Sequence, residues 1–229
     1  TKWATKYFPF TNRHFPNKGL SGEQMAIAIR EIGLEPYLFN VNSFDALKAT
    51  VYAYLKGKIP IIFGFGLWDI SDSAKPRNFG KHAVAITGYA LGENISNSFN
   101  GINNLTLTSS KIDKIFVHDD QVGPFAKMEF GEFLIDNVNC LDTTWKDKQQ
   151  TIGNIKATPE IIILPLYHKI RIPFEAILEA INPFNELCKA INNYNSEFPI
   201  FEWDVFLSNI KDLKGDIMND PIITPPYKR

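Results

Sequence analysis

The chain has 229 residues, of which 45% are hydrophobic and 21% charged, and its formal net charge is -1. This composition is that of a folded globular protein and excludes disordered and collagen-like classes. Basic and acidic residues balance, and the longest apolar run, residues 59–67, is too short to span a bilayer. We therefore predict no nucleic-acid partner, no membrane partner and a cytoplasmic location.

The hydrophobic pattern predicts helices and strands in an irregular order. In chain order they are a helix at 21–33, a strand at 37–39, a helix at 43–57, strands at 59–65, 82–89, 115–118 and 161–166, and a helix that begins at Pro173. Ser21 and Gln24 form a capping box at the start of the first helix. No strand–helix–strand unit repeats, so the predicted fold class is α+β.

The predicted elements fall into a core at 1–142 and a C-terminal extension at 143–229, which begins with a polar stretch. We expect the strand and helix of the extension to pack on the core, because about 70 residues with one amphipathic helix form only a marginal core alone. The Asn- and Ser-rich segment 93–110 predicts a long hairpin or a surface insertion.

The chain begins at Thr1 without a methionine or an apolar leader. We therefore expect an upstream domain of the same polypeptide as a partner.

His82 is the first candidate for chemistry, because it opens a predicted strand and Asp119 follows the next strand. An imidazole can act as the base for a thiol or hydroxyl when a carboxylate holds its other nitrogen in place. Antiparallel pairing of the two strands predicts that His82 and Asp119 lie within hydrogen-bond distance. Asp120 is the alternative partner, because the acid is doubled in the sequence.

Each of these residues also has a structural interpretation. A lone histidine is usually structural, and Asp119 or Asp120 can stabilise the turn before Gly123 through bonds to the backbone. His118 and Asp119 point to opposite faces of a strand, so they are not expected to bind the same ion. The sequence around them offers no second clustered His or Glu as a further ligand. We therefore predict no metal site and no cofactor.

Four short motifs stand in order over roughly residues 19–125. They are Gly19-Leu20-Ser21, Lys58-Ile59-Pro60-Ile61-Ile62, His82-Ala83-Val84-Ala85-Ile86-Thr87-Gly88-Tyr89 and Val117-His118-Asp119. Together they resemble the second half of a C39-like papain-fold cysteine peptidase domain. The resemblance implies a papain-like antiparallel sheet with flanking helices and a C-terminal helical extension. It also implies that His82 is the general base, that Asp119 or Asp120 orients it, and that the substrate is a peptide or an amide.

The chain departs from this family at the nucleophile. The family's catalytic cysteine and oxyanion-hole glutamine precede the Gly-Leu turn, whereas the two cysteines here, Cys140 and Cys188, both follow Asp119. Neither is expected to act as the nucleophile. Either an upstream segment supplies the cysteine, or the chain is a degenerate member that binds without cleaving. We thus predict a fragment of a cysteine peptidase or amidohydrolase that is inactive as it stands. The alternative is a non-catalytic binding or interaction module. The bias toward Asn, Lys, Ile and Phe resembles that of an AT-rich bacterial genome.

Overall fold

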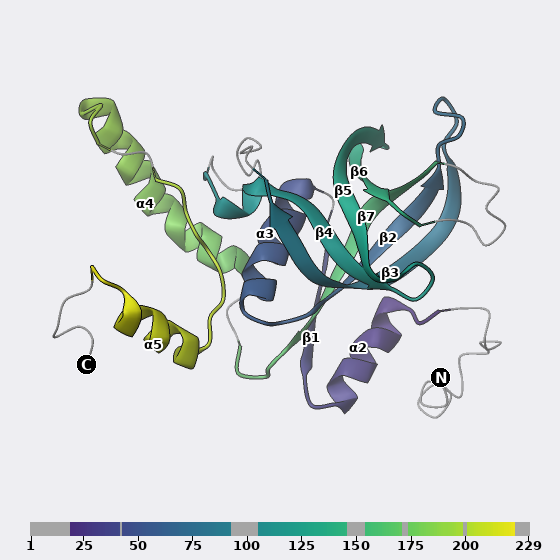
Figure 1. Cartoon of the computed structure of the whole chain (residues 1–229), viewed down its shortest axis with the longest axis horizontal. Coiled ribbons are helices and arrows are strands. Elements are labelled where there is room, and N and C mark those ends of the chain that lie inside the picture. The colour runs from purple at the N-terminus through teal and green to yellow at the C-terminus, as the bar shows by residue number, and fades with distance from the viewer. Residues whose placement is uncertain are drawn as a thin grey trace.

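The computed structural model describes residues 19–41, 43–92, 105–145, 154–170, 174–198 and 201–222. Its α-helices are α2 (Gly22–Glu31), α3 (Phe44–Lys56), α4 (Phe174–Tyr194) and α5 (Ile210–Asn219), and η1 (Thr108–Lys111) is a 3-10 helix. Its strands are β1 (Glu35–Asn40), β2 (Ile61–Asp69), β3 (Arg77–Leu91), β4 (Ile112–Asp119), β5 (Gly123–Ile135), β6 (Val138–Thr143) and β7 (Ile155–Leu166). Figure 1 shows their arrangement.

Six of the strands form a closed antiparallel barrel, and β1 lies outside the ring. The strand order is β1-β7-β2-β3-β4-β5-β6, and β6 also pairs with β7 and so closes the ring (Figure 1). The closing pairing is short, with Leu141 opposite Ala157 and Asp142 opposite Lys156. Residues 161–166 of β7 continue beyond this seam and pair with β1. Closure leaves the ring itself without a free edge.

This architecture shows that the predicted fold class is wrong. We expected a papain-like α+β fold with an open antiparallel sheet, and the chain instead forms a closed six-stranded barrel with one additional strand and four described helices. The prediction missed β5 and β6, whose residues contain no continuous apolar run. Asp136 and Asn137 join these strands with positive φ angles of 51° and 65°. Two such residues form the type I′ turn of a tight hairpin, and this local signal was overlooked.

The first two predicted helices are confirmed. The Ser21 hydroxyl accepts a hydrogen bond from the Gln24 amide, and the Gln24 side chain accepts one from the Ser21 amide. The Ser43 hydroxyl caps α3 in the same way, and Gly57 ends that helix. Most of the predicted insertion, residues 93–104, lies outside the described residues.

α3 and the inner face of the barrel share one hydrophobic core. Alternate residues of β2, such as Phe63 and Phe65, are fully buried. Leu47 and Val51 of α3 are fully buried in the same cluster. The helix lies at the end of the barrel where β2 and β4 begin and β3 ends (Figure 1).

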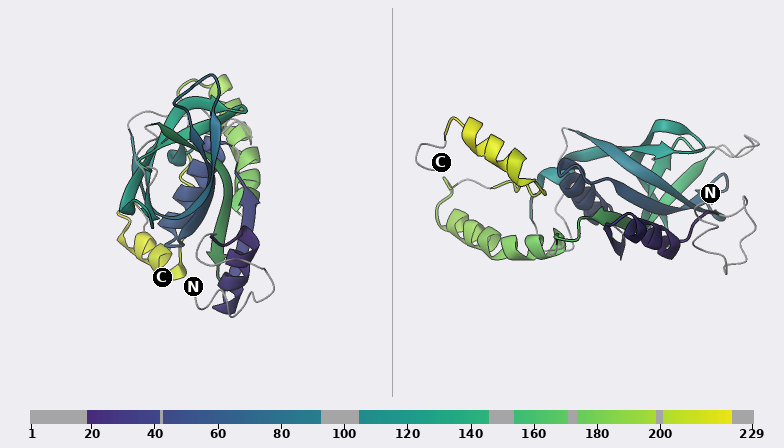
Figure 2. Two further views of the ribbon diagram at one scale, coloured as in Figure 1. Left: turned by 90° about the vertical axis from the view of Figure 1, so that its right-hand side faces the viewer. Right: turned by 90° about the horizontal axis from the view of Figure 1, so that it is seen from below.

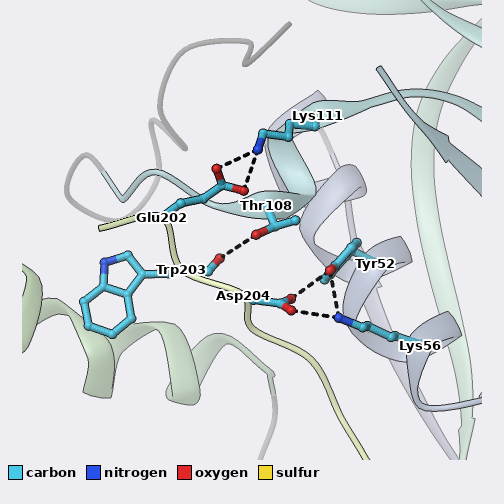
Figure 3. Close-up of polar contacts among 7 residues, drawn as sticks. All are labelled: Tyr52, Lys56, Thr108, Lys111, Glu202, Trp203 and Asp204. Carbon is cyan, nitrogen blue, oxygen red and sulfur yellow. Dashed lines mark hydrogen bonds and ion pairs between the residues drawn. The ribbon is translucent and has the colours of Figure 1, made fainter. Parts of the chain in front are cut away.

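A short C-terminal segment, residues 201–209, lies against α3 and η1 before α5 begins. Asp204 accepts hydrogen bonds from Tyr52 at 2.7 Å and from Lys56 at 2.8 Å (Figure 3). Glu202 pairs with Lys111 of η1 at 2.6 Å. These contacts attach the chain that leads to α5, while α4 and α5 extend away from the barrel (Figure 2). None of the described helices is both long and apolar enough to cross a membrane.

Candidate functional site

His82 and Asp119 meet on the inner side of the barrel, toward the end away from α3. His82 shares a face of β3 with Val84 and Ile86, which are both buried. Asp119 is the last residue of β4, and β4 begins beside α3. His82 Nε2 lies 3.1 Å from Asp119 Oδ2. The structure therefore brings together the two residues that strand order had paired.

The side chains of His82, Asp119 and Asp120 differ strongly in their exposure to solvent. The His82 side chain is 12% exposed and that of Asp119 only 4% exposed, whereas Asp120 is 83% exposed. Asp120 lies in the turn that follows β4, and its Oδ1 is 3.7 Å from His82 Nε2. Phe65 packs edge to face against the His82 ring, and the two ring centroids are 5.7 Å apart. The imidazole is therefore held by packing, with both carboxylates on its Nε2 side.

Asp119 also stabilises the turn that follows β4, which is the structural interpretation that the sequence offered for it. Its Oδ1 accepts hydrogen bonds from the backbone amides of Gln121 at 2.7 Å and Val122 at 3.2 Å. Such side chain–backbone bonds stabilise a turn. They also fix the carboxylate, so that Oδ2 is the oxygen that faces His82. The turn and the site thus depend on the same residue.

His82 and Asp119 lie within ion-pair distance of each other but are not hydrogen-bonded. Nε2 is buried and makes no hydrogen bond in the described structure, although Asp119 Oδ2 is 3.1 Å away. A hydrogen bond weakens steeply when its donor is misdirected, so a short distance between the two groups is not by itself a hydrogen bond. A carboxylate orients a catalytic histidine through a hydrogen bond to its ring N–H. This geometry lacks that bond.

The two cysteines lie on β6 and on α4. Cys140 lies on β6 and is fully buried beside Ile70 and Ile135. Burial raises the pKa of the Cys140 thiol to about 11. The group is therefore protonated at neutral pH, and the thiolate is the nucleophilic form. Cys188 is partly exposed on α4, which extends away from the barrel (Figure 1).

Sequence alternation placed His118 correctly, and Asp120, the alternative partner of His82, also lies near the imidazole. His118 is exposed and packs edge-on against Phe125, on the opposite strand face from Asp119. We argued against a metal site because neighbouring strand residues diverge. Asp120 lies beyond the strand, where alternation no longer applies. The turn therefore brings Asp119 and Asp120 to the same histidine. Among the described residues, His82, Asp119 and Asp120 are the group whose arrangement can hold a metal ion.

No family model matches this chain, and no curated protein or solved structure is significantly similar to it. Site geometry is therefore the basis on which a function is assigned.

Proposed function

We propose that this chain is a non-catalytic binding module whose site is the barrel end that carries His82, Asp119 and Asp120. One observation carries the proposal. His82 Nε2 is buried and faces two carboxylates without a hydrogen bond to either. A buried polar atom without a partner is costly, so such atoms are rare unless a ligand or an ion completes them.

The alternative is a cysteine peptidase or amidohydrolase that acts on a peptide or an amide. The 3.1 Å approach of His82 and Asp119 favours this function, as do the short motifs that resemble the C39-like family. Such an enzyme requires a thiolate within reach of the imidazole. The raised pKa of Cys140 opposes that role, and Cys188 lies on the extended helix α4. The binding module is therefore the better supported of the two.

Labelling with iodoacetamide at neutral pH distinguishes the two functions. We expect Cys140 to stay unmodified in the native protein, because its thiol is buried and protonated. Cys188 is partly exposed, and we expect any labelling of it to be independent of His82. Both rates, measured by peptide mass spectrometry, should be the same in wild type and in His82→Ala.

The matched control for this experiment is His118→Ala, which removes an exposed imidazole from the neighbouring strand. Rapid labelling of either cysteine that is lost in His82→Ala but kept in His118→Ala would overturn the proposal. It would identify that cysteine as a nucleophile activated by His82.

A further inference from the structure

Three potential ligand atoms converge at the barrel end away from α3. They are His82 Nε2, Asp119 Oδ2 and Asp120 Oδ1, and all three lie within 4.8 Å of one another. Divalent first-row metals bind nitrogen and oxygen ligands at about 2.0–2.2 Å. Two ligands at that distance are about 3.0 Å apart at a right angle and about 3.6 Å apart at about 120°. The observed separations from Nε2, 3.1 Å and 3.7 Å, are close to these values.

The charges of the site are not balanced by a basic side chain. In the described part of the chain, the ion-pair contacts of Asp119 and Asp120 are with His82 and with no lysine or arginine. The Asp119 side chain is 4% exposed, and a buried carboxylate is costly unless a cation or hydrogen bonds compensate it. Its Oδ1 has two backbone donors, whereas Oδ2 faces only Nε2.

Neither protonation state of His82 Nε2 satisfies the site without a cation. When the ring is neutral with its proton on Nδ1, Nε2 presents a lone pair that two carboxylates repel. When Nε2 carries the proton, the N–H should donate to a carboxylate, yet Nε2 makes no hydrogen bond within the described residues. A metal ion between the three atoms satisfies the lone pair and both oxygens at once.

We propose that His82, Asp119 and Asp120 bind one divalent first-row transition metal ion, of which Zn²⁺ is the representative. This inference rests on the proposed binding function and names the ligand class. An imidazole nitrogen favours zinc and its neighbours over Mg²⁺ and Ca²⁺, which prefer oxygen ligands alone. Two carboxylates balance the double positive charge. Asp120 is 83% exposed, so the remaining coordination positions face solvent or a bound partner.

The test is calorimetric titration of the full chain with Zn²⁺ after removal of metals by chelation. We expect one equivalent of Zn²⁺ per chain and loss of that binding in His82→Ala. Asp120→Asn should weaken binding at least tenfold, because it removes a charged ligand. Asp120 is exposed, and within the described residues its ion-pair contact is with His82, so we expect this variant to keep the fold. Circular dichroism and the melting temperature verify that each variant is folded.

His118→Ala is again the matched control, because it removes an exposed imidazole from the neighbouring strand and leaves the three proposed ligands in place. It should leave the affinity unchanged. Absence of stoichiometric binding, or equal affinity in wild type and Asp120→Asn, would overturn the metal site. Detection of a protonated, hydrogen-bonded Nε2 in the ¹⁵N spectrum of the zinc-treated protein would overturn it as well. None of these three results affects the labelling experiment, which tests the non-catalytic function separately.

Discussion

Replacement of Leu141 by alanine tests whether the barrel is closed between β6 and β7. Leu141 lies opposite Ala157 at the seam, and both side chains are fully buried. The substitution removes three carbons from the core, which is worth about 2.4 kcal/mol at about 0.8 kcal/mol for each buried CH₂. The cavity left behind adds to this, so we expect a loss of about 3–4 kcal/mol in the free energy of unfolding. That loss is a large share of the stability of a typical domain.

Urea denaturation followed by circular dichroism measures the loss. The control is Leu134→Ala, in which the same residue type is removed from an exposed position of β5, and it should cost less than about 0.5 kcal/mol. Hydrogen exchange adds a local observation. Amides of 138–143 and 155–158 should exchange faster in Leu141→Ala, while the pairing of β2 with β3 stays protected. A loss below about 1 kcal/mol, or no faster exchange at the seam, would show that β6 is a free edge and refute the closed ring.

Two further predictions concern β5 and the C-terminal segment. A Cβ at Gly131 would lie 2.8 Å from a backbone oxygen of β6, so Gly131→Ala should destabilise the protein by about 1–3 kcal/mol in thermal denaturation. Gly215→Ala, in open space on a helix, should instead be neutral or stabilising. Hydrogen bonds from Lys111 lower the pKa of Glu202. The contribution of Glu202 is therefore complete above its unfolded-state pKa of about 4.3 and is lost as the pH falls through the lower folded-state pKa. The stability difference between wild type and Glu202→Gln should accordingly disappear in acid, and a difference independent of pH would contradict this origin.

Local residues alone determined the helices at the start of the described chain. Ser21 and Gln24 bond to each other's backbone within one turn, and Ser43 and Gly57 set the ends of α3. These interactions join residues that are neighbours in the sequence, so the ends of both helices can be located without knowing the rest of the fold. The proximity of His82 and Asp119 was also predictable, because consecutive strands commonly pair.

Only the tertiary structure decided that the sheet closes. Alternation of apolar and polar residues is the same in an open sheet and in a barrel, so it does not show that Leu141 meets Ala157. Ring closure depends on the accumulated twist and stagger of all six strands. The same holds for Asp120, whose approach to His82 is set by the turn after β4. It holds as well for the contact of Asp204 with α3, which joins segments far apart in the chain. Local sequence patterns specify backbone conformation over a few residues, whereas these contacts depend on where whole elements lie in space.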